Sequence, residues 1–220
     1  MRYEPVVLSY YTAGTYYEKD AAKLKASCEE FGLEYRIEPI EPFGKWFEHA
    51  CFKPQYILKH FLTLQRPVLW IDADAEVVKK PKIFGAINTD LAIRIYDEFP
   101  PNHPSYFSGG TIYFDYNVRT AELLQVWKKA CDEAVGKCPP GSEVWDQMVL
   151  KAVVDPTISI TPLPRGYAAI FDVPSDLQEP YIIHYQASRL YKKFIDKQVA
   201  PFSFLDSLSA EELRTLRPTF

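Results

Sequence analysis

Residues 67–77, PVLWIDADAEV, run from a short apolar segment directly into two aspartates, Asp72 and Asp74, that are separated by one small residue. A continuous apolar run of this length, bounded by proline and aspartate, predicts a buried central strand. Because side chains alternate along a strand, we expect both carboxylates on the same face of it. Two acids held together at a buried strand end repel each other unless a cation lies between them. The stretch therefore predicts a divalent-metal site, against the alternative that the aspartates only form a turn.

The N-terminal segment predicts a strand at residues 6–10, an amphipathic helix at residues 18–31 that Gly32 ends, and a second strand at residues 35–40. This order is typical of a right-handed crossover between parallel strands of one sheet. The GxGxxG motif of dinucleotide-binding proteins is absent from the sequence. The segment therefore predicts an α/β fold without that fingerprint.

The end of the first strand and the helix predicted at residues 53–64 supply candidate ligand contacts. A nucleotide could lie over Tyr10, Tyr11 and Thr12, and the equally weighted alternative is that these residues only cover the sheet. Lys53 lies at the N-terminal end of the helix, where a cation is unfavourable against the helix dipole. We therefore expect Lys53 to have an anionic partner, with a solvated lysine as the alternative.

Two further predicted strands contain candidate ligand-binding residues. Residues 90–96 predict a strand that contains Arg94, and a buried arginine usually pairs with a carboxylate or a phosphate. Ser108, Gly109 and Gly110 open the next strand. Two glycines allow the backbone to approach a bulky group and leave its N–H donors unobstructed. The alternative for the glycine pair is a β-bulge.

Asp146 and Gln147 lie in the first two turns of a helix that we predict at residues 143–153, capped by Ser142. An acid at this position is favoured by the helix dipole alone. The pair is therefore a candidate site with a purely structural alternative.

A late strand predicted at residues 181–185 contains His184 and is followed by the cations Arg189 and Lys192. A lone histidine at a strand end is more often structural than a ligand, but the carboxylate pair upstream needs further ligands, which makes His184 a candidate. Residues 208–217 predict a C-terminal helix that a capping box opens. The sequence has no internal repeat and no obvious domain boundary, so we expect a single domain over residues 1–220.

Charge and cysteine usage exclude several classes. The formal net charge of −4 gives no broad basic surface for nucleic acid. No apolar run approaches the length of about 18 residues that a transmembrane helix needs, and the N-terminus lacks the apolar region of a signal peptide. The four cysteines match neither a zinc motif nor a dense disulfide framework. We therefore expect reduced thiols and a cytoplasmic location.

The segment at residues 53–74, with its Lys-Pro helix start and its LWIDAD run, resembles the GT-A-type nucleotide-diphospho-sugar glycosyltransferases. The later motifs follow in the order of that family: FSGG at residues 107–110, WDQ at residues 145–147 and IHY at residues 183–185. The arrangement looks most like the glycogenin and bacterial galactosyltransferase-like branch, and it covers residues from about 5 to 195.

This resemblance implies a single GT-A (Rossmann-like) α/β domain with a mostly parallel central sheet flanked by helices. Its nucleotide-binding half would span about residues 1–100 and its acceptor and sugar half about residues 101–195. The metal ligands would be Asp72, Asp74 and His184. A histidine beside carboxylates favours Mn²⁺ over Mg²⁺ because of ligand softness.

The resemblance also assigns roles toward the donor. Asp146 and Gln147 would face the donor sugar as catalytic residues. The residues expected to bind the donor are Tyr10, Tyr11, Thr12, Lys53, Asp72, Ala73, Asp74, Arg94, Ser108, Gly109, Gly110, Arg189 and Lys192. In the family a lysine in a glycine-containing turn after the histidine often binds the phosphates, whereas this chain has QASR at residues 186–189. Either Arg189 or Lys192 would have to replace it.

The implied function is a metal-dependent glycosyltransferase that moves a sugar from a nucleotide-diphosphate donor, with a UDP-sugar favoured, to an acceptor hydroxyl with retention of configuration. The acceptor, whether a glycan, a lipid-linked group or a protein, stays open. One alternative is a catalytically silent module that binds a nucleotide sugar or a glycan. A second is an aspartyl phosphatase with a DxD motif, but such proteins place the motif near the N-terminus and favour Thr or Val where this chain has Glu76.

Overall fold

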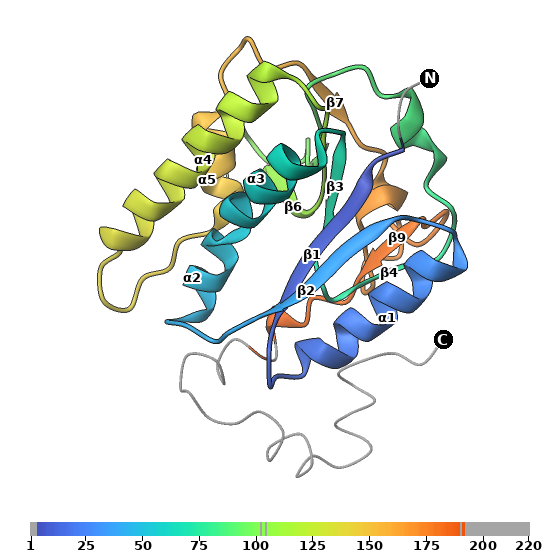
Figure 1. Cartoon of the computed structure of the whole chain (residues 1–220), viewed down its shortest axis with the longest axis horizontal. Helices are drawn as coiled ribbons and strands as arrows, with labels where there is room; N and C mark the ends of the chain where they lie inside the picture. The colour runs from blue at the N-terminus through green and yellow to red at the C-terminus, as the bar shows by residue number, and fades with distance from the viewer. Residues whose placement is uncertain (1–3, 102, 104, 190, 192–220) are drawn as a thin grey trace.

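The computed structural model describes residues 4–101, 103, 105–189 and 191. A six-stranded sheet in the order β2-β1-β3-β6-β5-β7 lies at the centre, and a three-stranded sheet in the order β4-β9-β8 lies beside it (Figure 1). The large sheet consists of β1 (Val6–Thr12), β2 (Tyr35–Ile40), β3 (Val68–Ile71), β5 (Leu91–Ile95), β6 (Phe107–Phe114) and β7 (Ile160–Pro162). The small sheet consists of β4 (Ala75–Val77), β8 (Ala169–Ile170) and β9 (Ile182–His184).

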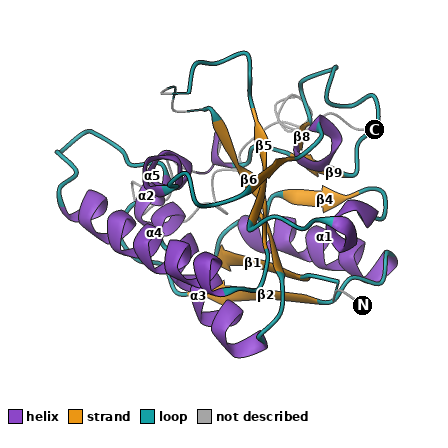
Figure 2. Cartoon of the chain, turned by 90° about the horizontal axis from the view of Figure 1, so that it is seen from above, coloured by secondary structure: helices purple, strands orange, loops and turns teal. Residues whose placement is uncertain are grey.

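The described helices surround these sheets. They are α1 (Tyr17–Glu30), α2 (Trp46–Cys51), α3 (Lys53–Leu64), α4 (Val118–Gly136) and α5 (Asp146–Val153), together with the short 3₁₀ helices η1 (Lys82–Ala86) and η2 (Arg165–Ala168). Figure 2 shows α3, α4 and α5 grouped on one side of the large sheet and α1 on the other. Among the described helices, none is long and apolar enough to cross a membrane.

In the large sheet, β6 alone runs against its neighbours. It pairs antiparallel with β3 and β5, whereas β1 pairs parallel with β2 and β3, and β5 pairs parallel with β7. The expected α/β fold with a mostly parallel central sheet flanked by helices is therefore confirmed. The predicted strand, helix and strand at the N-terminus are β1, α1 and β2, and Gly32 after α1 has a positive φ of 64°.

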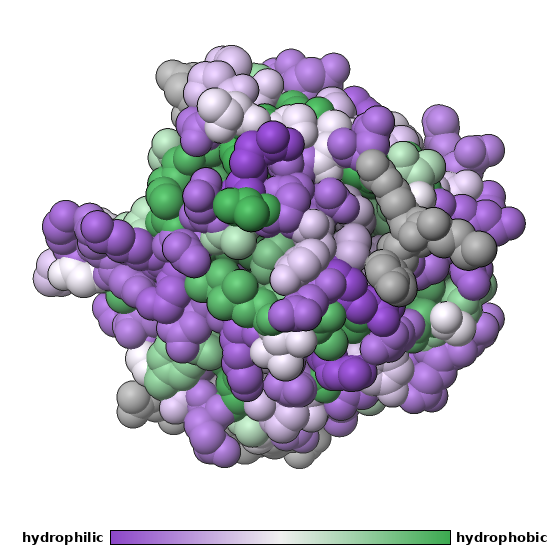
Figure 3. Space-filling view, turned by 45° about the horizontal axis from the view of Figure 1, so that its top comes forward, coloured by the Kyte–Doolittle hydropathy of each residue, from purple (hydrophilic) through white to green (hydrophobic). Residues whose placement is uncertain are grey.

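Alternating side chains on the central strands supply two separate cores. Leu8 and Trp70 face a cluster that α3 and α4 cover, and their neighbours Val7 and Leu69 face a cluster on the α1 side. Burial on both faces explains why these strands are continuously apolar. Polar side chains remain at the surface, and Figure 3 shows that they cover most of the visible face.

The DxD motif does not lie on a strand. β3 ends at Ile71, residues 72–74 form a turn, and β4 begins at Ala75 in the small sheet. The backbone N–H of Ala75 donates to the carbonyl oxygen of Asp72 at 3.0 Å, which closes the turn. The expectation that strand alternation places both aspartates on one face was therefore wrong. They lie together because a tight turn carries the chain from one sheet to the other.

Other predicted elements differ from the structure mainly at their ends. Helix α3 has the predicted bounds, but α5 begins at Asp146 with Trp145 as its N-cap, so Ser142 does not cap it. The last predicted strand, at residues 181–185, shortens to β9. The predicted helix at residues 208–217 lies outside the described residues, and the division of residues 1–220 into two halves of one domain stays a prediction.

Asp90, which precedes β5, is a buried acid that stabilises this side of the fold. Burial opposes its charge, but hydrogen bonds from Arg119, Ser159 and Asn117 outweigh this and lower the pKa of Asp90 to about 2. Its folded pKa lies below its unfolded value, so the stabilisation is present above about pH 4 and is lost as pH falls through the folded pKa. We expect Asp90→Asn to lower the free energy of unfolding by about 1 to 2 kcal/mol at pH 7.

Urea unfolding of both proteins between pH 7 and pH 2 measures this effect. The difference between wild type and Asp90→Asn should shrink below about pH 4, because the Asp90 carboxyl then becomes protonated and neutral, as the asparagine is at every pH. A difference that stays constant over this range would contradict the assignment.

Candidate active site

A cavity of about 580 Å³ opens where β1, β3, β6 and the N-terminus of α5 come together. Its volume is within the range of small-molecule sites. All the predicted site residues that the structure describes line it: Tyr10, Tyr11, Thr12, Lys53, Asp72, Ala73, Asp74, Arg94, Ser108, Gly109, Gly110, Asp146, Gln147, His184 and Arg189. Lys192 lies outside the described residues. The fold therefore brings residues from almost the whole chain to one place, while the role of each stays a prediction.

Asp72, Asp74 and His184 form the candidate metal centre. Each offers one ligand atom, and these atoms lie within 4.8 Å of one another. The antiparallel pairing of β4 with β9, which sets Ala75 opposite His184, brings the histidine to the DxD turn. The backbone N–H of Ala187 donates to Asp74 Oδ2 at 2.6 Å, so the chain after β9 also holds this carboxylate in place.

The two nitrogens of the His184 ring have different surroundings. Nε2 lies 2.8 Å from Thr111 Oγ1, whereas Nδ1 is buried without a hydrogen-bond partner among the described residues. Burial, with smaller contributions from Lys53 and Arg94, lowers the pKa of His184 to about 3. In the tautomer whose Nε2–H donates to Thr111, Nδ1 has a free lone pair, which fits a metal ligand whose other nitrogen is oriented by a hydrogen bond.

Gly110 is required beside this ring. A Cβ on Gly110 would lie 2.8 Å from Cε1 and 2.9 Å from Nδ1 of His184, closer than side-chain carbons approach. The expectation that a glycine lets the backbone approach a bulky group is thus confirmed at this position. The residues present therefore fit a bound divalent cation, with carboxylate and imidazole ligands and the ring held from behind.

Thr111 is a residue that the sequence analysis missed, and its hydroxyl gives a test of the histidine assignment. We expect Thr111→Val, which keeps the shape but removes the hydroxyl, to weaken Mn²⁺ binding by about 10- to 100-fold, because the ring loses its orienting partner. Titration followed by the electron paramagnetic resonance of free Mn²⁺ measures this. Thr63→Val, an identical change on the exposed face of α3, is the matched control. Equal affinities for the two variants would contradict a ligand role for His184.

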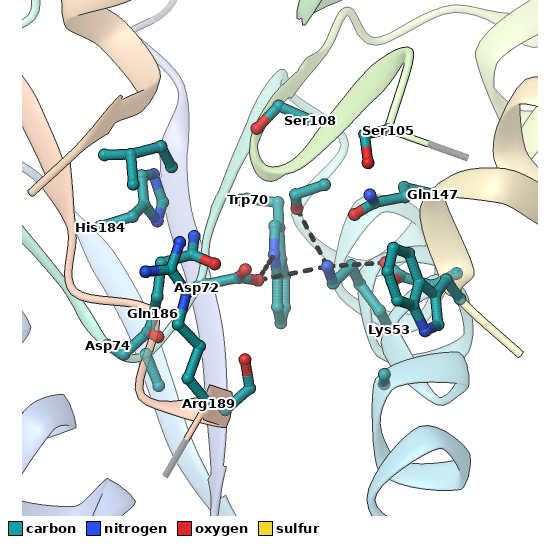
Figure 4. Close-up of a pocket in the computed structure, with 18 of the residues that line it drawn as sticks. Lys53, Trp70, Asp72, Asp74, Ser105, Ser108, Gln147, His184, Gln186 and Arg189 are labelled. Atoms are coloured by element: carbon teal, nitrogen blue, oxygen red, sulfur yellow. Dashed lines mark hydrogen bonds and ion pairs between the residues drawn. The ribbon is translucent and has the colours of Figure 1, made fainter. Parts of the chain in front are cut away.

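Asp72 is held on one side by Trp70 and Lys53. The indole Nε1–H of Trp70 donates to Asp72 Oδ1 at 2.7 Å, and Lys53 Nζ lies 3.2 Å from the same oxygen (Figure 4). Because both interactions meet one oxygen, they fix the carboxylate orientation. Trp70 was not among the predicted site residues, although its position two residues before Asp72 was the available signal.

Lys53 joins the candidate metal centre to the candidate catalytic pair. Its buried ammonium lies 2.7 Å from Asp146 Oδ2 and donates to the carbonyl oxygen of Gly109 at 2.9 Å, in addition to Asp72. Burial alone would lower the pKa of Lys53, but the two carboxylates raise it above its usual value. Burial raises the pKa of Asp146, and Lys53 opposes that shift. The expected anionic partner of Lys53 is confirmed, and it is a pair of aspartates.

The three acceptors around Lys53 equal the number of N–H donors on an ammonium group. A lysine engaged in this way has no further donor for a phosphate unless one of these contacts breaks. Its predicted contact with the donor would therefore be indirect, through the orientation of Asp72 and Asp146.

Both a β-bulge and a close backbone approach, which the sequence analysis gave as alternatives for Gly109 and Gly110, are present in the structure. Ile93 of β5 pairs with Ile112 and Ile95 pairs with Phe107, so β6 contains extra residues between these pairs and bulges. At the bulge, a Cβ on Gly109 would lie 2.9 Å from the Oε1 atom of Gln147. The bulge is thus the means by which the backbone approaches the start of α5.

The two predicted arginines of the site that the structure describes have carboxylate partners. Arg94 is buried and forms a bidentate ion pair with Asp176, with Nη2 at 2.9 Å from Oδ1, and donates to the carbonyl oxygen of Ala168. Arg189 is more exposed and pairs with Asp172. Of the two partners predicted for Arg94, the structure therefore contains the carboxylate, from a segment far away in the sequence.

The aromatic residues at the end of β1 are partly structural. The Tyr10 ring packs against Phe52, Tyr56 and Trp70, and its hydroxyl donates to the carbonyl oxygen of His49 at 2.5 Å. Tyr10 therefore covers the sheet and also lines the cavity, while its contact with a nucleotide stays a prediction.

No family model matches the sequence, and no curated protein matches it. The fold is similar to solved structures of glycosyltransferases. One is a glycosyltransferase involved in the glycosylation of the major capsid of PBCV-1, with a TM-score of 0.65 and 14% sequence identity over 89% of this chain and 98% of that chain. Another is the glycosyltransferase GlyE of Streptococcus pneumoniae TIGR4, with a TM-score of 0.57 and 12% identity.

The apo form of GlyE gives a TM-score of 0.54 and 14% identity. The two GlyE structures match 94% of this chain, which spans 65% and 64% of their own lengths. Identities this low establish a glycosyltransferase-like fold, and they leave the branch, the donor and the acceptor undetermined.

Proposed function

We propose that this chain is a metal-dependent glycosyltransferase that transfers a sugar from a nucleotide-diphosphate donor, with a UDP-sugar favoured, to an acceptor hydroxyl. The observation that carries this proposal is the Asp72, Asp74 and His184 group in the cavity wall of a glycosyltransferase-like fold. The group joins two carboxylates with a neutral imidazole that has an unpartnered buried nitrogen. Such a ligand set suits Mn²⁺, with Mg²⁺ as the alternative ion.

The residues around the cavity would have separate roles in such a reaction. A bound cation supplies charge stabilisation for the leaving nucleotide diphosphate. Asp72, Asp74 and His184 would hold the cation, and Lys53 keeps the Asp72 carboxylate in a fixed orientation. Arg189 lines the cavity beside these residues and is the described cation best placed to bind the outer phosphate, if it leaves Asp172. Tyr11, Thr12 and Ala73 would contact the nucleoside.

Asp146 and Gln147 are assigned to the donor sugar. The Asp146 carboxylate is held in an ion pair with buried Lys53, so we assign it to charge stabilisation at the anomeric centre rather than to proton removal. Gln147 presents an amide at the same helix start. Neither residue is then a general base, and this division of roles agrees with the retention of configuration that the resemblance favours.

Two alternative functions can be distinguished from this proposal. A silent module would bind the nucleotide sugar with metal and never release or transfer the sugar. An aspartyl phosphatase would use Asp72 as a nucleophile, but Oδ1 of Asp72 is engaged by Trp70 and Lys53, and the similar solved structures are glycosyltransferases. We keep a cytoplasmic location as an expectation from the cysteines, all four of which are free in the structure.

A thermal-shift screen of UDP-, GDP-, CMP- and dTDP-sugars, each with Mn²⁺ and with EDTA, tests the proposal. We expect stabilisation by one class of donor that requires Mn²⁺, because binding to the folded state raises the melting temperature. The stabilising donor is then incubated with the protein, and release of free sugar or nucleotide separates an enzyme from a silent module. The absence of stabilisation by every donor would contradict the proposal.

A further inference from the structure

The residues that line the cavity extend past Lys53, on the side away from the candidate metal centre. Figure 4 shows Asp74 and His184 on one side of Lys53, and Gln147 with Ser105 on the other. A donor whose diphosphate lies at the metal centre and whose sugar lies at Gln147 would leave this second part of the cavity open. The residues of that part, rather than the metal centre, would then contact the acceptor.

Two exposed aromatic residues line the cavity. Trp145 is 38% exposed and Phe99 is 36% exposed, whereas Trp70 and Trp127 are buried in the core. Trp145 directly precedes the catalytic pair and is the N-cap of α5. Phe99 comes from the separate connection between β5 and β6, so two distant segments each contribute a ring.

Neighbouring groups hold both rings in place. The Trp145 indole Nε1–H donates to Glu143 Oε2 at 3.4 Å. The Phe99 ring stacks on His103, with 4.1 Å between ring centroids and 11° between planes. An exposed aromatic ring that is already oriented loses little conformational freedom when a ligand packs against its face.

The cavity lining also includes polar side chains close to Phe99 in the sequence. Glu98 and Ser105 come from the same connection as Phe99. An aromatic face with hydrogen-bonding groups around it matches a pyranose ring. The C–H groups on one face of the sugar are weakly positive and pack on the negative face of an aromatic ring, and the hydroxyl groups at the sugar edge need donors and acceptors. A lipid chain would leave these polar groups without partners.

We propose that the acceptor is a carbohydrate whose terminal ring stacks on Trp145, with Phe99 and the polar groups around it completing the subsite. This inference rests on the proposed function and names its acceptor class. Trp145 lies next to Asp146 in the chain, so a sugar on its indole would lie beside the residues assigned to the donor sugar. The position favours delivery of a sugar hydroxyl to the anomeric carbon.

The experiment uses the full chain with UDP and Mg²⁺, and a panel of methyl glycosides of glucose, galactose, mannose and N-acetylglucosamine. Saturation-transfer difference spectra report which sugar protons lie against the protein. We expect the strongest signals from the C–H groups of one sugar face. Trp145→Ala should reduce these signals and raise the dissociation constant of the best glycoside by about tenfold or more, and Trp145→Phe should retain most of the binding, because it keeps an aromatic face.

Phe99→Ala should weaken glycoside binding less strongly than Trp145→Ala. Because Phe99 lies on a different segment, this effect cannot come from a local disturbance of α5. Tyr116→Ala, which removes an exposed ring outside the cavity lining, is the control and should change nothing. UDP affinity with metal reports on the donor site separately. If UDP binds and no glycoside does, or if Trp145→Ala leaves glycoside binding intact, the acceptor proposal is overturned while the proposed function stands. If no donor nucleotide binds, both are overturned.

Discussion

Asp74→Asn is expected to abolish Mn²⁺-dependent nucleotide binding, with a loss of Mn²⁺ affinity of more than about 100-fold. The substitution removes the negative charge and a strong cation ligand but keeps an oxygen that can accept from the Ala187 N–H. Asp74 is only 9% exposed, so water replaces the lost ligand poorly. Calorimetric titration of UDP in the presence of Mn²⁺, together with a direct Mn²⁺ titration, measures both effects.

Thermal stability in EDTA separates this loss from unfolding. Without a metal, the carboxylates of Asp72 and Asp74 repel each other, so the neutral asparagine should leave the melting temperature unchanged. Asp132→Asn makes the same chemical change on the exposed surface of α4 and should bind Mn²⁺ like wild type. A normal Mn²⁺ isotherm for Asp74→Asn would refute the metal centre and, with it, the proposed mechanism.

Lys53→Met is expected to produce the largest loss of stability, about 3 kcal/mol or more in the free energy of unfolding. Lys53 and Asp146 have side chains that are 6% and 8% exposed, so the substitution leaves a buried carboxylate without its counter-charge. The variant also loses the cation–π contact with the Trp70 ring at 5.1 Å. Urea unfolding at pH 7 measures the change.

A second substitution identifies the cause of that loss. In Lys53→Met with Asp146→Asn, the buried charge is gone, and we expect at least half of the lost stability to return. Lys129→Met, a fully comparable change at a side chain that is 81% exposed, should alter stability by less than about 0.5 kcal/mol. If the double variant is no more stable than Lys53→Met, the ion pair is not what stabilises this part of the site.

Much of the fold follows from local patterns. Helix α3 has the predicted bounds because Pro54 fits a first helical turn and the apolar side chains of the segment recur at helical spacing. β3 was predicted from its apolar run, since burial on both faces requires apolar residues at every position. Element ends were less certain. α5 starts three residues later than predicted, because residues 143–145 form no helical turn and Trp145, the N-cap, has an extended backbone.

For the candidate site, the lining residues could be predicted from the sequence, but the way in which the fold brings them together could not. Its predicted residues were identified from motif order and residue type, and those the structure describes line one cavity. The reason given for the aspartate pair was nevertheless wrong, because a turn between two sheets, and not one strand, places Asp72 beside Asp74. The sequence did not identify Asp176 as the partner of Arg94, since either a carboxylate or a phosphate could have paired with the buried charge.

The main helices and strands, the class of fold and the candidate metal ligands could be predicted from the sequence, because these depend on side-chain type and on short-range periodicity. How the candidate ligands are held could be seen only in the folded chain. Trp70 bonds to Asp72, Thr111 bonds to His184, and Lys53 bridges Asp72 and Asp146. Most of these contacts join segments that are distant along the chain, and their partners are fixed by strand pairing and by the β6 bulge, which no local pattern specifies.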